Sequence, residues 1–225
     1  MIIEPVGDNP LKNQDMENET RKDYWDKIYL TRKSEELSWT QENPKTSLDF
    51  IHSFNLSTHA SIIDVGGGDS RFVDRLIDEG FDDITVLDIS YQALKRAKER
   101  LGQRGKKINW VVSDITEFKT EKTFDLWHDR ATFHFLTKGE EISKYLEIAN
   151  SNIKDNGFLT IGSFSENGPT KCSGFDITQY SETTMTNRLN MFFEKIRCIT
   201  VDHKTPYDTI QNFIFCNFRK IQTAS

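Results

Sequence analysis

A run of apolar residues that ends in three consecutive glycines most constrains how this 225-residue chain can fold. Residues 61–65 read Ser-Ile-Ile-Asp-Val, then Gly66, Gly67 and Gly68 follow, and a helix-like segment comes next. Glycine between a strand and a helix lets the backbone approach a ligand closely and adopt dihedral angles that a Cβ atom would forbid. The following helix turns its free N–H groups and the positive end of its dipole toward that ligand. The sequence therefore predicts a ligand-binding turn.

Short strands and helices alternate on both sides of this turn. Strands are predicted at residues 62–65, 84–88, 108–112, 124–127 and 158–164, and helices at 71–78, 91–101 and 140–153. This alternation predicts a mostly parallel, doubly wound α/β sheet with helices on both faces. Two further strands, 193–201 and 210–218, are joined by too few residues for a parallel crossover, so we expect an antiparallel hairpin there. Residues 57–225 would form this one domain.

The residues before this domain divide into two segments. Residues 1–18 are polar and contain prolines without an apolar period, which predicts a flexible arm. Residues 19–56 are expected to be helical, with Asn43 and Pro44 supplying the cap and first turn of the second helix. The first helix has an aromatic face made of Tyr24, Trp25, Ile28 and Tyr29. We expect its Trp25 and Ile28 to pack against the domain and Trp39, in the loop that follows, to act as a lid.

Composition excludes several classes of protein. The net charge of -6 and the isoelectric point near 5.5 argue against a nucleic-acid partner, which normally meets a basic surface. No apolar run is long enough to span a membrane, and the N-terminus lacks the pattern of a signal peptide. The three cysteines are widely spaced and fit neither a disulfide framework nor a metal site. A reduced, cytoplasmic protein without a metal is therefore expected.

The acidic residues at the strand ends distinguish between two ligands of a glycine-rich turn. A dinucleotide site has a third glycine where this chain has Arg71, and Asp64 would face the pyrophosphate unfavourably. A carboxylate at position 64 suits an ammonium group instead, and Asp88, at the end of the second strand, can accept hydrogen bonds from both ribose hydroxyls. S-adenosylmethionine carries an ammonium group and a ribose together.

Five motifs in order resemble those of class I S-adenosylmethionine-dependent methyltransferases. They lie at residues 64–68, 86–90, 113–115, 124–129 and 154–157, and the resemblance extends over about residues 60–218. The resemblance implies a Rossmann-like sheet in the order 3-2-1-4-5-7-6 with an antiparallel C-terminal strand. It also implies S-adenosylmethionine as the cofactor and S-adenosylhomocysteine as the product.

The same resemblance implies which residues bind the cofactor. They are Asp64, Gly66, Gly67, Gly68, Asp88, Ile89, Asp114, Ile115, His128 and Trp39. The glycines would pass against the methionine moiety, although many members have cysteine or alanine where this chain has Gly67. Ile89 would pack on the adenine, and Asp114 would accept a hydrogen bond from its amino group. Structural alternatives remain open: helix capping for Asp64 and Asp88, core packing for the isoleucines, and an Asx-turn for Asp114.

Candidates for catalysis follow the fourth strand. His128, Asp129 and His134 are expected near the ligand crevice, because strand ends line it in open α/β sheets. Histidine suits a general base because its ordinary pKa lies near the operating pH. Alternatively, His128 touches the cofactor through its backbone only, and Asp129 pairs with Arg130. The loop at residues 165–175 is expected to form part of the substrate wall.

The predicted function is methyl transfer to a small-molecule acceptor. A protein lysine is the alternative acceptor, because the N-terminal aromatic segment also resembles that of some lysine methyltransferases. A second alternative is a non-catalytic nucleotide- or partner-binding module that keeps this fold.

Overall fold

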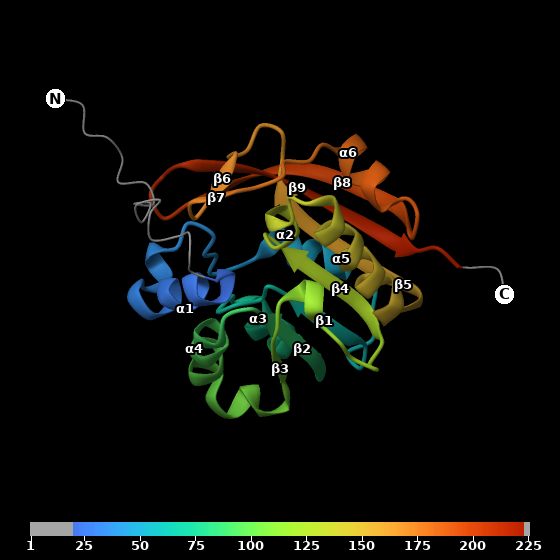
Figure 1. Cartoon of the computed structure of the whole chain (residues 1–225). Coiled ribbons are helices and arrows are strands. Elements are labelled where there is room, and N and C mark those ends of the chain that lie inside the picture. Colours follow the sequence, from blue (N-terminus) through green and yellow to red (C-terminus); the bar gives the residue numbers. More distant parts are fainter. Residues whose placement is uncertain (1–19, 223–225) are drawn as a thin grey trace.

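The computed structural model describes residues 20–222, so the predicted arm at residues 1–18 lies outside the described residues. A seven-stranded sheet in the order β3-β2-β1-β4-β5-β9-β8 forms its centre (Figure 1). The strands are β1 (Ser61–Val65), β2 (Asp83–Asp88), β3 (Asn109–Val112), β4 (Phe124–Arg130), β5 (Ile153–Phe164), β8 (Phe193–Lys204) and β9 (Ile210–Lys220). Strands β1 to β5 pair in parallel, whereas β9 is antiparallel to both of its neighbours. The predicted doubly wound fold and its strand order are confirmed.

Helices cover both faces of the sheet, as predicted. They are α1 (Arg21–Thr31), α2 (Lys45–His52), α3 (Phe72–Asp78), α4 (Tyr91–Leu101), α5 (Gly139–Asn152) and α6 (Glu182–Leu189). Successive side chains of a strand point to opposite faces, so Ile62 of β1 packs with α2, α3 and α4, whereas Ile63 packs with α5 and α6. Two apolar layers therefore hold the sheet between the helices.

Shorter elements complete the described chain. They are the 3-10 turns η1 (Ser34–Glu36), η2 (Gly102–Lys107), η3 (Ile115–Glu117) and η4 (Phe133–Phe135) and the small hairpin of β6 (Lys171–Cys172) and β7 (Phe175–Asp176). The hairpin and α6 were not predicted; they lie in and after the loop that was expected to be irregular. Figure 1 shows β6 and β7 near α1, on the same side of the molecule.

Three local expectations differ from the structure. Strand β4 continues three residues beyond its expected end, because Asp129 and Arg130 pair with β5, and His128 therefore lies within the strand. Strand β5 begins at Ile153, and the expected turn at residues 155–157 is an irregularity in its pairing with β4. Pro44 is the N-cap of α2 and does not lie in its first turn.

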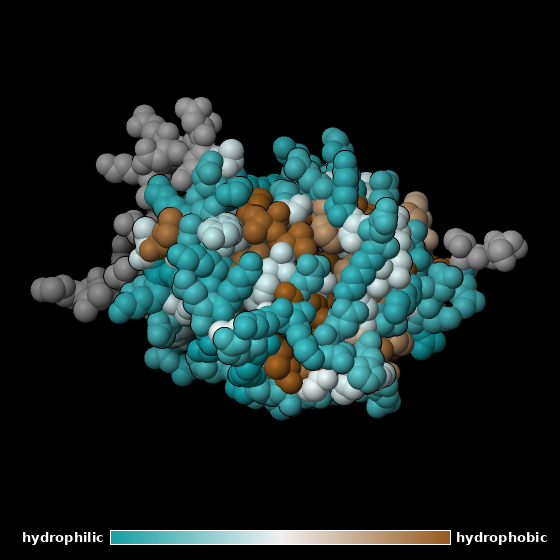
Figure 2. Space-filling model, turned by 90° about the horizontal axis from the view of Figure 1, so that it is seen from below, coloured by the Kyte–Doolittle hydropathy of each residue, from teal (hydrophilic) through white to brown (hydrophobic). Residues whose placement is uncertain are grey.

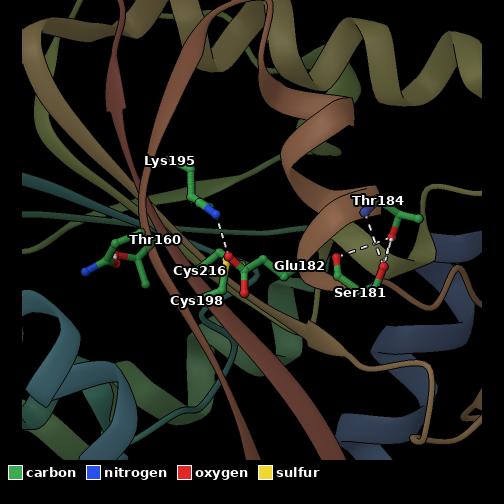
Figure 3. The surroundings of a disulfide bond; sticks show 8 residues. Thr160, Ser181, Glu182, Thr184, Lys195, Cys198 and Cys216 are labelled. Carbon is green, nitrogen blue, oxygen red and sulfur yellow. Dashed lines mark hydrogen bonds and ion pairs between the residues drawn. A yellow bond between two sulfur atoms is a disulfide. The ribbon is translucent and has the colours of Figure 1, made fainter.

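The cysteines require a correction. The sequence predicted reduced thiols, but Cys198 of β8 and Cys216 of β9 form a disulfide bond (Figure 3). The two residues lie directly opposite each other in the antiparallel register. The pairing depends on the register of the hairpin, which the spacing of the cysteines along the chain does not reveal. Cys172 is not part of a disulfide bond.

Figure 2 shows one face on which hydrophilic residues predominate and apolar residues form separate patches, in keeping with a mean hydropathy of -0.60. No helix among residues 20–222 is long and apolar enough to cross a membrane. The same residues contain no cluster of three or more histidine, cysteine or acidic side chains arranged to hold a metal ion.

Candidate active site

A cavity of about 540 Å³ lies where the carboxyl ends of β1, β2 and β4 meet the N-terminal segment. Ligand cavities commonly measure about 300–1,000 Å³. Predicted site residues line it from both sides: Trp39, Asp64, Gly66, Gly67, Asp88, Ile89, Asp114, Ile115 and His128. The structure thus brings most of the predicted cofactor residues to one cavity.

The glycine turn forms the floor of this cavity and has no room for side chains. Gly66 and Gly68 adopt φ angles of +65° and +52°, which strain residues that carry a side chain. A Cβ atom on Gly66 would lie 1.7 Å from Thr132 Oγ1, and one on Gly67 would lie 2.5 Å from Asp64 Oδ2. The backbone of the turn is therefore the surface that a ligand meets. Gly68 is not part of the lining and faces Tyr29.

Asp64 and His128 form a hydrogen-bonded pair beside the turn. His128 Nδ1 lies 2.7 Å from Asp64 Oδ1, and His128 Nε2 lies 2.9 Å from Ser47 Oγ. Because a carboxylate only accepts, Nδ1 donates to Asp64, and the Ser47 hydroxyl can donate to Nε2 of the neutral ring. Asp64 Oδ2 is buried and has no hydrogen-bond partner among the described residues. One carboxylate oxygen is therefore available to a ligand.

Asp88 lies at the end of β2, where its side chain is held by backbone groups. Oδ1 accepts a hydrogen bond from the Ser90 N–H at 2.7 Å, and the Gly68 backbone N–H also donates to the carboxylate. Burial raises the pKa of Asp88 to about 7, with smaller contributions from Asp64 and Asp69. A carboxyl with this pKa changes its charge near neutral pH.

Residues that follow β2 and β3 line the cavity beside Asp88. Ile89 is half-buried, and Ile115 is buried in the core as well as forming part of the lining. Asp114 caps η3, because Oδ1 accepts hydrogen bonds from the backbone N–H and the hydroxyl of Thr116, both at 2.8 Å. Asp114 therefore makes the hydrogen bond of an Asx-turn, which was its structural alternative, and it also lines the cavity.

Two predicted catalytic residues lie outside the lining. Asp129 accepts hydrogen bonds from the N–H groups of Thr132 and Phe133 and from the Tyr145 hydroxyl, which fixes the turn after β4. Burial raises the pKa of Asp129 to about 6. His134 is buried against Phe164 with its ring centroid 4.7 Å away.

The ring of His134 is isolated from polar groups. Neither of its nitrogens has a hydrogen-bond partner in the described chain. Burial, together with the charge of Arg130, lowers the pKa of His134 to about 3. Of the three candidates, the structure therefore places only His128 at the cavity.

Aromatic residues form a further part of the lining, which we call the aromatic wall. Trp25 lies edge-on to Trp39 at 5.7 Å and to Phe135 at 5.4 Å, and it stacks on Phe175 at 6.3 Å. Trp25, which we expected to pack only against the domain, therefore lines the cavity together with Trp39. Tyr29 completes this wall.

Polar contacts hold the N-terminal segment over the cavity. The Ser34 hydroxyl donates to Asp69 at 2.7 Å, and the Ser90 hydroxyl donates to Asp26 at 2.7 Å. His203 Nε2 donates to the Ser38 carbonyl at 2.7 Å. His203 of β8 thus fastens the N-terminal segment, and neither His203 nor Tyr207, in the loop that follows β8, is in the lining.

Sequence reasoning missed several residues of the cavity. Ser47 and Arg130 line it, as do Phe135 and Gln211, whereas Cys172 and Phe175 belong to the loop at residues 165–175 that was predicted as part of the wall. Arg130 was considered only as a partner of Asp129, yet the structure shows no ion pair between them. The sequence carries no signal for Ser47, because its proximity to His128 arises from the packing of α2 on the sheet.

Comparison with known proteins places the chain in a family. A family model described as "Methyltransferase domain" matches residues 63–159. "EEF1A lysine methyltransferase 2" of Danio rerio is 30% identical over 157 residues, which cover 63% of this chain and 67% of that protein. This chain belongs to the class I S-adenosylmethionine-dependent methyltransferases, and S-adenosylmethionine is the cofactor of that family.

Solved structures share the fold. One from a study titled "Conversion of a Disulfide Bond into a Thioacetal Group during Echinomycin Biosynthesis" has a TM-score of 0.75 and 14% identity, covering 92% of this chain and 94% of its own. The N-methyltransferase NodS from Bradyrhizobium japonicum, in complex with S-adenosylhomocysteine, has a TM-score of 0.63 and 20% identity. That match covers 81% of this chain and 90% of the other.

Proposed function

We propose that this chain transfers a methyl group from S-adenosylmethionine to a small-molecule acceptor. The observation that carries the proposal is a single cavity with two different parts. Carboxylates and the glycine turn line one part of it, and aromatic rings of the fastened N-terminal segment, with Phe135 and Phe175, line another. The first part suits the cofactor, and the second suits a compact, largely apolar acceptor.

The residues present fit the cofactor. Asp64 Oδ2 is a buried carboxylate oxygen without a partner, which an ammonium group would satisfy. A Cβ atom on Gly67 would lie 2.5 Å from the same Asp64 oxygen and would crowd the proposed ammonium site. Asp88 would hold the ribose, and Ile89 and Asp114 the adenine. When bound, S-adenosylmethionine supplies a methyl group on a positively charged sulfur, which a nucleophile displaces in line.

The aromatic wall would orient the acceptor and exclude water. Ring faces attract a cation, so Trp25 and Trp39 suit a site that receives positively charged sulfur. Keeping water out strengthens every electrostatic interaction inside the cavity. Holding two reactants in the right geometry supplies much of the rate of such a reaction.

A chain of three side chains provides a route for an acceptor proton. Ser47 lines the cavity, and its hydroxyl can donate to His128 Nε2. A proton leaving the acceptor could pass to the Ser47 oxygen while the hydroxyl proton moves to His128. Asp64 then stabilises the imidazolium through the hydrogen bond from Nδ1. In this proposal His128 is the base, and Asp64 orients it.

A protein lysine is the second candidate acceptor. It is favoured by the similarity to the Danio rerio protein, whose name describes a lysine methyltransferase. The enclosed aromatic wall favours the small molecule, because a side chain on a protein must enter past the segment held by Ser34 and Ser38.

Methyl-labelled S-adenosylmethionine distinguishes the candidates. The purified protein is incubated with a metabolite extract and, separately, with a proteome extract. We expect label in small molecules, and loss of that label with the variant Asp88→Ala. Label confined to a protein band would support the lysine acceptor. Cofactor binding without any transfer would contradict both proposals and favour the non-catalytic alternative.

A further inference from the structure

Arg130, the last residue of β4, brings an incompletely paired positive charge to the cavity. Its Nη1 donates to the Trp39 carbonyl at 2.9 Å. Its Nε and Nη2 are shielded from solvent and have no hydrogen-bond partner among the described residues. Burial lowers the pKa of Arg130 to about 10, so the group stays charged at neutral pH.

The other arginines in the lining are paired, which makes Arg130 an exception in the described part of the chain. Each of them has a carboxylate within 4.0 Å: Arg21 with Glu141, Arg71 with Glu42 and Asp74, Arg96 with Asp69, and Arg100 with Asp74. A buried charged donor without a partner is costly. An anion from outside the chain would remove this cost.

The geometry of the free donors indicates the kind of anion. Nε and Nη2 lie on one edge of the planar guanidinium, and their N–H groups point the same way. Two such donors match the two oxygens of a carboxylate in a bidentate contact. The edge that Arg130 leaves free is therefore one that recognises carboxylates.

The guanidinium lies on the β9 side of the cavity, and Asp64 is the carboxylate whose charge acts on it most. The guanidinium lies 5.1 Å from the centroid of the Phe213 ring on β9, two strands away from β4 in the sheet. Asp88 and Asp114 follow β2 and β3, on the other side of β4.

We propose that the methyl acceptor carries a carboxylate on an apolar or aromatic body, and that Arg130 binds this carboxylate through Nε and Nη2. The proposal rests on the proposed transfer to a small molecule and names the class of that molecule. Phe164 and Phe213 would contact the body of the acceptor, and the anchored carboxylate would fix the distance of its nucleophile from the methyl group.

Binding of matched acids and amides tests the proposal without any turnover. Calorimetry on the full chain saturated with S-adenosylhomocysteine compares benzoate with benzamide, phenylacetate with phenylacetamide, and hexanoate with hexanamide. We expect at least one acid to bind about ten-fold more tightly than its amide, as a hydrogen-bonded charge pair provides. Arg130→Gln should abolish this difference and leave the affinity for S-adenosylhomocysteine within about three-fold of the wild type.

Two further variants control the experiment. Arg219→Gln removes an exposed arginine that also lies over a phenylalanine, Phe158 at 5.4 Å, but outside the cavity lining. It should keep the preference for the acid. Arg130→Lys keeps the charge and loses the planar pair of donors, so it should retain only part of the preference. It also carries the test if Arg130→Gln does not fold.

Three results would overturn the proposal. The first is equal affinity for the acid and the amide in all three pairs. The second is a preference for the acid that keeps its full size in both Arg130 variants. The third is a ten-fold or greater loss of affinity for S-adenosylhomocysteine, about 1.4 kcal/mol, in Arg130→Gln. The last would assign Arg130 to the carboxylate of the cofactor. Label found only in proteins would contradict the proposed function and leave the acid preference of the cavity unchanged, so the two failures are distinguishable.

Discussion

Asp64 and His128 lie opposite each other on the adjacent strands β1 and β4, and His128 Nδ1 donates a 2.7 Å hydrogen bond to Asp64 Oδ1. Both side chains are buried. The bond fixes which nitrogen of His128 carries the proton. Asp64 Oδ2 stays available to a ligand, and His128 Nε2 faces the Ser47 hydroxyl. The pair therefore connects the proposed ammonium site to Ser47 and the acceptor.

Removing the Ser47 hydroxyl should slow methyl transfer without weakening the binding of the cofactor. In Ser47→Ala, His128 Nε2 loses its contact with the acceptor proton, and we expect kcat to fall about 100-fold. The affinity for S-adenosylhomocysteine should change by less than about two-fold, since Ser47 has no hydrogen bond to Asp64 or Asp88, which would hold the ammonium group and the ribose. Ser53→Ala is the matched control, because the Ser53 hydroxyl donates to the Phe50 carbonyl at the end of the same helix. Wild-type turnover in Ser47→Ala would exclude the relay.

Cofactor affinity should weaken on acidification. Burial raises the pKa of Asp88 to about 7, and only the ionised carboxylate accepts from both ribose hydroxyls with full strength. As the pH falls from about 8 to about 6, the protonated fraction rises, and affinity should drop by up to about ten-fold per pH unit below the pKa. Calorimetric titrations across this range would show it, and Asp88→Asn should bind more weakly with a flatter profile. A wild-type affinity that does not vary with pH would contradict the assignment.

Two substitutions in α1 test whether the aromatic wall contributes to binding of the acceptor. Trp25→Ala removes the ring that contacts Trp39, Phe135 and Phe175, and we expect kcat/KM for the acceptor to fall about ten-fold or more. Leu30→Ala is the control, because Leu30 lies on the same helix with 65% of its surface exposed. Equal kinetics for the two variants would show that Trp25 serves packing alone.

His134 should affect stability in acid more than catalysis. Its pKa is lowered to about 3 in the folded chain, whereas the unfolded side chain titrates near 6.5. The stability that depends on neutral His134 is present above about pH 6.5 and is lost as the pH falls toward about 3. His134→Phe lacks this loss, so its free energy of unfolding relative to the wild type should rise by about 2 kcal/mol between pH 7.5 and pH 5.

Urea unfolding at the two pH values measures this change, and a difference that stays constant would contradict it. The same variant tests the general base predicted from the sequence at position 134. Because His134 is not in the cavity lining, we expect turnover to be kept within about three-fold. Loss of turnover with unchanged stability would restore His134 as a candidate base.

The fold, and the gathering of the strand-end residues at one cavity, could be predicted because they depend on local patterns. Carboxylates at strand ends, such as Asp88, and glycines in turns, such as Gly66, can be recognised in the sequence. The pattern that marks each of them spans only a few residues. The continuation of β4 through Arg130 was missed because it depends on pairing with β5. The disulfide bond between Cys198 and Cys216 was missed because it also depends on strand pairing, namely on the register between β8 and β9.

The acceptor end could not be predicted because distant segments build it. Ser47 meets His128 across 81 positions of the chain, and the Trp39 carbonyl meets Arg130 across 91. The apolar patterns of α1 and α2 indicate that these helices pack on the sheet. They do not indicate which residues of the sheet each helix contacts. Trp25 shows the same limit, since helical spacing indicates a buried face and says nothing of the cavity beyond it.

A crystal structure of the chain with S-adenosylhomocysteine tests the central claim most directly. The account predicts both ribose hydroxyls within about 3.2 Å of the Asp88 carboxylate and the ammonium group within about 3.2 Å of Asp64 Oδ2. The aromatic end between Trp25 and Arg130 should stay outside the volume that the cofactor fills. A cofactor bound away from Asp64 and Asp88, or one whose carboxylate occupies the free edge of Arg130, would contradict the account.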